Sequence, residues 1–251
     1  MPRRLGQHFL VRESVLEKLA VAACGEHTSR AIEIGPGRGA LTRKLLARVD
    51  ELHAVELDPG LVEHLGRVFT ADPKLHLHAG DVLTTDLAQW GPAAIAGNLP
   101  YYITSPIIEK FLKLDHQFPV AVFLLQSEVA QRLIASPGTR DYGYLTVVTR
   151  LICDVELVCQ VPPAAFSPPP KVNSAGVRLI RKPQHPVRLD SLRTLISRSF
   201  AHKRKTLRNN LRPFYGPDVD SLPEAQLRAE QLSIDAFIDL HSRLSPGSEV
   251  H

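Results

Sequence analysis

The chain has 251 residues, a formal net charge of +4, 44% hydrophobic residues and 22% charged residues. This composition is typical of a globular protein of one large domain or slightly more, and it argues against a disordered, fibrous or collagen-like chain. The sequence has no run of eighteen apolar residues and no apolar segment after its basic start, so we expect no membrane span, no signal peptide and a cytoplasmic protein.

The first distinctive stretch is Gly6–Leu10, which precedes a predicted helix beginning near Ser14. The order of Ser14 and Glu17 is that of a capping box, which would place Ser14 at the helix N-cap. Phe9 and Leu10 could fold over a pocket, or could simply pack as a hydrophobic staple against the helix.

A glycine-rich loop follows the first predicted strand, 31–34, and leads into a helix through Leu41 and Leu45. Its sequence is Gly35-Pro36-Gly37-Arg38-Gly39, and such strand-to-helix turns let the backbone approach a ligand closely. A second strand, 52–55, ends at Glu56, where a carboxylate can reach a ribose diol. A third, 76–78, leads to Asp81 and Val82, which would suit the edge and face of an adenine.

Two cofactor classes compete for this loop. Its glycines fit a loose form of the dinucleotide fingerprint, which would indicate an NAD-dependent oxidoreductase. Glu33 argues against that class, because a carboxylate just before the glycines repels a pyrophosphate but favours an ammonium group. S-adenosyl-methionine carries an amino group and a sulfonium, so we expect S-adenosyl-methionine.

Residues 97–101, Gly-Asn-Leu-Pro-Tyr, close a short apolar run, 93–96, that we predict to be a buried strand. Ligands bind at the carboxyl ends of strands in open α/β sheets. The side-chain carbonyl of Asn98 and the backbone carbonyl of Leu99 could accept both N–H groups of an exocyclic amine, and Tyr101 offers a flat face for stacking. The competing interpretation is an ordinary turn with a buried tyrosine.

The middle of the chain predicts a helix over 105–114, a strand over 120–125 and a helix over 128–134. The apolar segment 145–152 fits either a helix or a strand, whereas 154–161 alternates as a strand. A proline-rich loop, 166–174, precedes the last strand, 176–180. Phe166 in this loop is a candidate second wall for a flipped base; the alternative is a phenylalanine that fills the core.

The composition changes near residue 183, and we predict two domains, 1–182 and 183–251. The second is predicted to be helical and to bind RNA phosphates, since six basic residues and no acid lie between positions 198 and 212. The candidate RNA-binding residues are Arg198, Lys203, Arg204, Lys205 and Arg208. No histidines have metal-ligand spacing and the three cysteines, Cys24, Cys153 and Cys159, have no CxxC spacing, so we expect no metal site and reduced thiols.

Taken together, these ordered motifs closely resemble the ribosomal RNA adenine dimethyltransferases, specifically the bacterial small-subunit enzymes, from about Leu5 to Leu244. The resemblance implies an α/β fold: a Rossmann-like class I S-adenosyl-methionine-dependent methyltransferase sheet with an added antiparallel strand, plus a small all-helical C-terminal domain. It also implies dimethylation of two adjacent adenines in the 3′-terminal hairpin loop of small-subunit rRNA within an immature 30S particle. We expect a monomer.

The resemblance also assigns roles to individual residues. It implies that His8 and Leu10 lie over the cofactor, that Gly35 and Gly37 contact its methionine part, and that Glu56 and Asp81 hold its ribose and adenine. Many relatives have asparagine where this chain has His8.

For the target base, the resemblance implies that Asn98 binds the amine beside the methyl group, while Tyr101 and Phe166 enclose the adenine. The related resistance enzymes, which methylate large-subunit rRNA, lack a run like residues 201–207, Ala-His-Lys-Arg-Lys-Thr-Leu. A ribosome-assembly checkpoint that binds the subunit, with methylation secondary, is the alternative from another functional class.

Overall fold

The computed structural model describes residues 8–70, 72–183 and 189–244, and contacts divide the chain into two units. The sheet unit contains the described residues up to Ala130 together with Val155–Arg181. The helical unit contains Gln131–Asp154 and the described residues from Lys182 onward. Gly6 and Gln7, part of the N-terminal motif, lie outside the described residues.

A seven-stranded sheet forms the centre of the sheet unit, in the order β4-β3-β2-β5-β6-β9-β7. Its strands are β2 (Thr28–Ile34), β3 (Val49–Glu56), β4 (Leu75–Ala79), β5 (Ala94–Asn98), β6 (Val120–Gln126), β7 (Cys153–Val161) and β9 (Ser174–Arg181). The pairs from β4 through β6 are parallel, and β9 is antiparallel to β6. The predicted Rossmann-like sheet with an added antiparallel strand is therefore confirmed.

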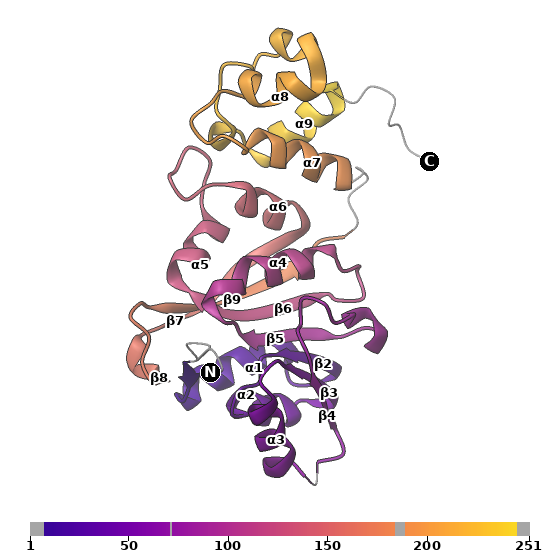
Figure 1. Cartoon of the computed structure of the whole chain (residues 1–251), viewed down its shortest axis with the longest axis vertical. Helices are drawn as coiled ribbons and strands as arrows, with labels where there is room; N and C mark the ends of the chain where they lie inside the picture. The colour runs from indigo at the N-terminus through magenta and orange to yellow at the C-terminus, as the bar shows by residue number, and fades with distance from the viewer. Residues whose placement is uncertain (1–7, 71, 184–188, 245–251) are drawn as a thin grey trace. The chain divides into compact units, whose positions relative to one another are not determined.

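The strand order reverses beside β2, because β3 and β4 lie on one side of it and β5 and β6 on the other (Figure 1). In open α/β sheets this reversal leaves a crevice at the carboxyl ends of the strands, where ligands bind. The glycine loop follows β2 and Asn98 ends β5, so both predicted motifs lie at this crevice.

Helices accompany the strands of this unit, namely α1 (Glu13–Cys24), α2 (Ala40–Leu46), α3 (Pro59–Val68) and α4 (Thr104–Lys113). The apolar face of α1, including Leu16 and Leu19, packs into the core with α2 and the central strands. A two-stranded sheet, β1 (Phe9–Leu10) with β8 (Phe166–Ser167), joins the N-terminal segment to the proline-rich loop.

The predicted capping box at the start of α1 is wrong. The helix begins at Glu13, so Ser14 lies inside its first turn, and the N-cap Arg12 makes no side-chain cap. Glu17 instead pairs with Arg48 and Lys44, which draw its carboxylate away from the helix N-terminus. With the N-cap at Arg12, the N3 position falls on Val15, so Ser14 and Glu17 do not occupy the two positions of a capping box.

The helical unit contains α6 (Tyr144–Ile152), α7 (Leu189–Ser199), α8 (Leu207–Tyr215) and α9 (Ile234–Leu244) (Figure 1). The helix α5 (Ser127–Ile134) precedes them, and the boundary between Ala130 and Gln131 falls within it. The apolar segment 145–152 is thus a helix, and α6 contacts α7 and α9. Contacts place residues 131–154 with the C-terminal helices, although the sequence suggests a single division near residue 183. Within the described residues, no helix has both the length and the apolar character needed to cross a membrane.

Candidate functional site

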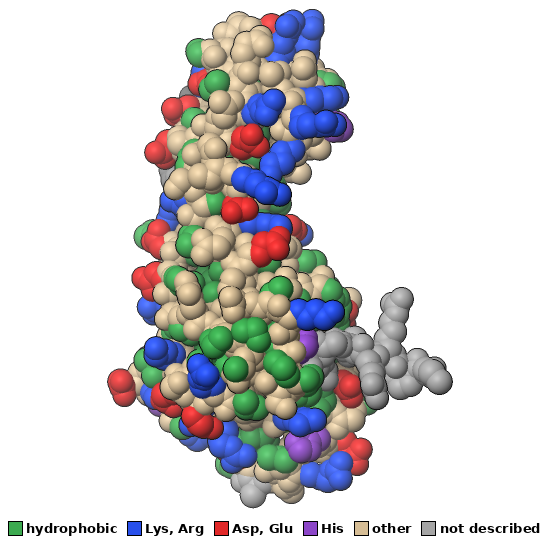
Figure 2. Space-filling model, turned by 90° about the vertical axis from the view of Figure 1, so that its left-hand side faces the viewer, with side chains coloured by type: hydrophobic (Ala, Val, Ile, Leu, Met, Phe, Trp, Pro, Cys, Tyr) green, Lys and Arg blue, Asp and Glu red, His purple; other side chains and the backbone are tan. Residues whose placement is uncertain are grey.

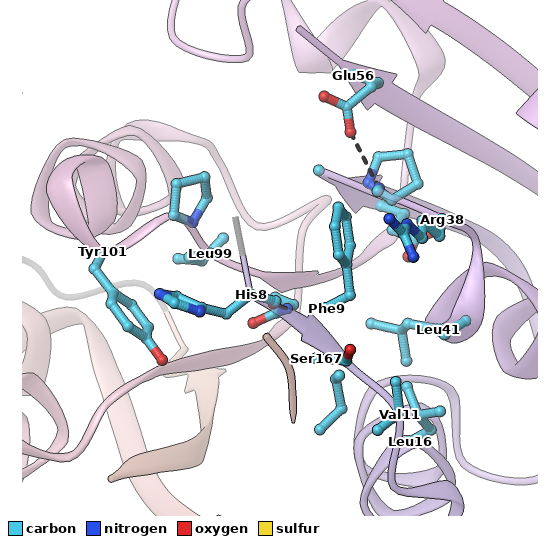
Figure 3. Close-up of a pocket in the computed structure, with 18 of the residues that line it drawn as sticks. His8, Phe9, Val11, Leu16, Arg38, Leu41, Glu56, Leu99, Tyr101 and Ser167 are labelled. Atoms are coloured by element: carbon cyan, nitrogen blue, oxygen red, sulfur yellow. Dashed lines mark hydrogen bonds between the residues drawn. The ribbon is translucent and has the colours of Figure 1, made fainter. Parts of the chain in front are cut away.

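A cavity of about 380 Å³ opens at the carboxyl ends of β2 and β5 (Figure 3). Its volume lies within the range of small-molecule sites, roughly 300–1,000 Å³. The residues around it come from the N-terminal segment, the glycine loop, the end of β3, the 98–102 turn and β8. Of the predicted site residues, the following line it: His8, Leu10, Glu33, Gly35, Gly37, Glu56, Asn98, Leu99 and Tyr101.

The glycine loop needs its glycines for two reasons. Gly35 and Gly37 have φ angles of +66° and +59°, which side chains other than glycine rarely adopt. A Cβ atom on Gly37 would also lie 3.1 Å from the Phe9 ring, which packs directly on the loop. The backbone of the glycine loop therefore borders the cavity directly, and Phe9 of the N-terminal segment packs against the loop.

Glu56 is held in place by the backbone of two loops. One carboxylate oxygen accepts a hydrogen bond from the Gly37 N–H at 3.1 Å, the dashed line in Figure 3, and the other accepts one from the Asp58 N–H at 3.0 Å. These bonds fix the side chain, which is only 5% exposed, at the wall of the cavity. Carboxylate oxygens can each accept more than one bond, so Glu56 can still bind a diol.

Glu33 is almost fully buried, at 1% exposed, yet it borders the cavity. Burial, opposed by the nearby Thr42 hydroxyl and reinforced by the Glu56 charge, raises the pKa of Glu33 to about 8. Among the described residues, its Oε2 atom has no hydrogen-bond partner of normal geometry, and neither does the Thr42 hydroxyl. A buried polar atom without a partner is costly, and a cationic ligand group beside it would remove that cost.

Asn98 is oriented by the N-terminal segment. Its Nδ2 donates a hydrogen bond to the His8 backbone carbonyl at 3.0 Å. Because a carbonyl oxygen can only accept, this bond identifies the nitrogen end of the amide, and Oδ1 is the end directed elsewhere. The predicted role of Asn98 as an acceptor for an amine is consistent with this orientation.

Tyr101 lines the cavity, and two contacts hold its side chain in place (Figure 3). Its hydroxyl shares a hydrogen bond of 2.8 Å with the Ser174 hydroxyl, and its ring stacks on the His8 ring with centroids 5.9 Å apart. The His8 Nδ1 donates to the Pro168 carbonyl at 2.9 Å, which links this stack to the proline-rich loop. The tyrosine face is therefore held in a defined orientation.

Three other predicted residues lie outside the cavity lining. Phe166 is 4% exposed and packs in the hydrophobic core, and its backbone pairs with Leu10. The ring that faces Tyr101 is that of His8, so the role of Phe166 as a second wall stays a prediction. Asp81 and Val82 follow β4, whose end pairs with Glu56, but they do not line the described cavity. The Asp81 carboxylate accepts a bond from the Leu83 N–H at 2.8 Å, and its role also stays a prediction.

Sequence reasoning missed Arg38 and Ser167 as lining residues and left Phe9 undecided. The Arg38 guanidinium lies 4.5 Å from the centre of the Phe9 ring, so that ring is packed between a cation and the glycine loop. The position of Arg38 between two glycines of the loop could have identified it as a lining residue. Its contact with the Phe9 ring could not be predicted, because Phe9 belongs to a distant segment of the sequence.

The helical unit gathers Lys and Arg side chains on one side, as Figure 2 shows at the top of the view. The predicted RNA-binding residues differ in their surroundings there. Arg208 pairs with Asp220 at 2.7 Å, and the Arg198 guanidinium lies over the Phe214 ring at 4.2 Å. Asn210 donates to the Ser199 and His202 carbonyls, which fixes the loop that carries residues 203–205. Residues 203–205 are all exposed.

Comparison with known proteins agrees with this arrangement. The sequence profile of the family "Ribosomal RNA adenine dimethylase" matches residues 2–244. The chain is 41% identical to ribosomal RNA small subunit methyltransferase A of Chromobacterium violaceum, over 96% of this chain and 95% of that protein. It is 39% identical to the protein of the same name from Picosynechococcus sp., with 97% of each chain covered.

Two solved structures are similar over almost the whole chain. A dimethyladenosine transferase from Plasmodium falciparum has a TM-score of 0.80 at 27% identity, and the match covers 93% of this chain and 96% of that chain. The 23S rRNA methyltransferase ErmE has a TM-score of 0.71 at 28% identity, with coverage of 94% and 99%.

Proposed function

Because the chain belongs to the ribosomal RNA adenine dimethylase family, whose members are S-adenosyl-methionine-dependent enzymes that act on rRNA, we propose that it dimethylates adenines of small-subunit rRNA. We place the target at the two adjacent adenines of the 3′-terminal hairpin loop, within an immature 30S particle. The small-subunit assignment is supported by the names of the relatives at 39–41% identity and by the basic run 201–207. The orientation of Asn98 is the structural observation that supports adenine as the target.

The cavity fits the cofactor on two observations. The Oε2 of Glu33, which has no partner among the described residues, suits the cationic methionine part. Gly35 and Gly37 line the cavity with backbone alone, so a ligand can approach that backbone closely. Glu56 would hold the ribose hydroxyls, and Asp81 with Val82 would hold the adenine. When bound, S-adenosyl-methionine supplies a methyl group activated by its sulfonium.

Catalysis then rests on the position of the target amine. An adenine amine is a weak nucleophile because its lone pair is delocalised into the ring. Asn98 Oδ1 and the Leu99 carbonyl would accept its two N–H groups and hold it towards a tetrahedral shape, with the lone pair towards the methyl group. Such positioning can contribute up to roughly 7–11 kcal/mol. The apolar residues Phe9 and Leu41 in the cavity wall would exclude water from the reaction.

The target base must leave its stack before it reaches the cavity. Base flipping costs a few kcal/mol and costs least in a loop, which is single-stranded. Stacking on an aromatic ring returns roughly 1–3 kcal/mol per base, and Tyr101 is held in place for that purpose by Ser174.

To test this function, the purified protein is incubated with methyl-labelled S-adenosyl-methionine and small subunits that lack the hairpin dimethylation. The modified positions are then mapped by primer extension across the 3′ end of the rRNA. Label at both loop adenines is the expected result. Label on large-subunit rRNA would instead favour the resistance-type activity, and tight subunit binding without label would favour the assembly checkpoint.

The variant Asn98→Ala tests the role of the Asn98 amide in positioning the target amine. We expect the rate of methyl transfer to fall by about a hundredfold or more, while the affinity for RNA is unchanged. Cofactor affinity is measured alongside, because the same amide holds the His8 carbonyl. Normal methyl transfer by Asn98→Ala would contradict the mechanism.

A further inference from the structure

The loop that joins α5 to α6, residues 135–143, is anchored to the C-terminal part of the helical unit. The Gly138 N–H donates to the Glu230 carbonyl at 2.7 Å, and the Tyr142 hydroxyl, in a side chain only 1% exposed, donates to the Leu232 carbonyl at 2.8 Å. The loop also has internal bonds, including Thr139 Oγ1 to the Ser136 carbonyl at 2.7 Å. It therefore has a defined shape before any partner binds.

A third contact connects this loop to the basic run 203–205. The Lys203 ammonium donates to the Arg140 backbone carbonyl at 3.0 Å, although the two residues are 63 positions apart. In Figure 1 the α5–α6 loop rises towards the orange segment around α7 and α8. The bond brings two loops that both carry positive side chains into one surface, which we call the bridged basic surface: Arg140, Lys203, Arg204 and Lys205.

All four cations of the bridged basic surface are exposed. Among the residues that the structure describes, none of the four forms an ion pair, although Asp141 next to Arg140 is also exposed. Arg208 and Arg212 differ from them, because both pair with Asp220 at 2.7 and 3.5 Å. Bringing unpaired like charges together is unfavourable, and binding of a polyanion offsets that cost.

We propose that Arg140 binds an RNA phosphate as part of the bridged basic surface, together with residues 203–205 of the other loop. The partner is the sugar–phosphate backbone of the rRNA, contacted without regard to base sequence. The planar guanidinium suits phosphate oxygens, and the anchored loop loses little conformational entropy on binding. This inference rests on the proposed rRNA substrate and adds a contact from a segment that precedes the C-terminal helices in the sequence.

The test is the salt dependence of RNA affinity for the full-length protein. The probe is a hairpin RNA with the sequence of the 3′ end of small-subunit rRNA, and Kd is measured by fluorescence anisotropy for wild type and Arg140→Gln. One phosphate contact contributes a slope of about 0.9 in log Kd against log salt. Lowering salt from about 0.2 M to about 0.05 M should therefore raise the ratio of the variant Kd to the wild-type Kd by about 3.5-fold.

Two further variants control the measurement. Arg67→Gln removes the same charge from an exposed arginine of α3 that pairs with Glu63, and its Kd ratio should stay near one at both salt concentrations. Arg140→Lys keeps the charge and should retain the wild-type salt slope. The Arg140–phosphate contact would be refuted if Arg140→Gln kept the wild-type slope of log Kd against log salt. It would also be refuted if Arg140→Lys lost as much of that slope as Arg140→Gln is expected to lose.

Failure of this inference differs from failure of the proposed function. If wild type methylates the subunit but Arg140→Gln binds the hairpin as wild type does, only the Arg140 contact is wrong. If wild type neither binds the hairpin nor transfers methyl groups to any rRNA, the proposed function is wrong as well.

Discussion

Protonation of Glu33 should control cofactor affinity, and Glu33→Gln isolates the effect. The side chain is 1% exposed and its Oε2 has no partner among the described residues, so burial raises its pKa to about 8. Near neutral pH the carboxyl group is therefore mostly protonated. If the cationic cofactor binds only the carboxylate form, Glu33 must lose its proton on binding.

The size of the effect follows from that pKa. With a value of about 8, the ionised fraction is about 1 in 33 at about pH 6.5 and about 1 in 4 at about pH 7.5. Cofactor affinity should therefore rise about eightfold over this interval, equivalent to about 1.2 kcal/mol. At about pH 7, binding should release about 0.9 proton from Glu33.

Isothermal titration calorimetry in buffers of different ionisation enthalpy measures both quantities. The cofactor's own amino group also titrates, but it does so with either protein, so the comparison is between wild type and Glu33→Gln. The affinity ratio of wild type to variant should grow about eightfold from about pH 6.5 to about pH 7.5. Equal proton release and equal pH dependence in the two proteins would refute the reasoning, provided that their thermal unfolding curves coincide.

Two further predictions concern stability. Gly97→Ala should lower the free energy of unfolding by about 1–3 kcal/mol, because the added Cβ would lie 2.6 Å from the Ile34 carbonyl oxygen of the neighbouring strand; an unchanged urea midpoint would contradict this. His53 hydrogen-bonds His78 at 3.0 Å and Glu51 at 2.9 Å. Its ring stacks on those of His76 and Trp90, and the Glu51 carboxylate also pairs with Arg30. Burial lowers the pKa of His53 and of His78, so below about pH 6.5 the unfolded chain takes up protons that the folded histidines resist. Stability should fall from about pH 7 to about pH 5.5, and His53→Gln should reduce that slope in urea titrations.

Local patterns were sufficient to predict the elements that carry the site. The glycine loop after β2, Glu56 at the end of β3 and Asn98 at the end of β5 could be located because short apolar strands end in polar or glycine residues. Parallel strands align their carboxyl ends, so placing each residue at a strand end was enough to predict a common edge. The cofactor class followed from the glycine loop together with the acids and the amide in their order along the chain, of which Glu33 beside the glycines argued most directly against a pyrophosphate.

Contacts between distant segments decided what those side chains do. The His8 carbonyl sets the direction of the Asn98 amide, 90 residues away, and core packing takes Phe166 out of the cavity lining. Asp220 neutralises Arg208, whereas the four cations of the bridged basic surface pair with no carboxylate among the described residues. Residues 131–154 are grouped with the C-terminal helices by their contacts. Sequence periodicity predicts which face of a single helix or strand is buried. It does not identify contact partners such as these, which are tens of residues apart and meet only when the chain is folded.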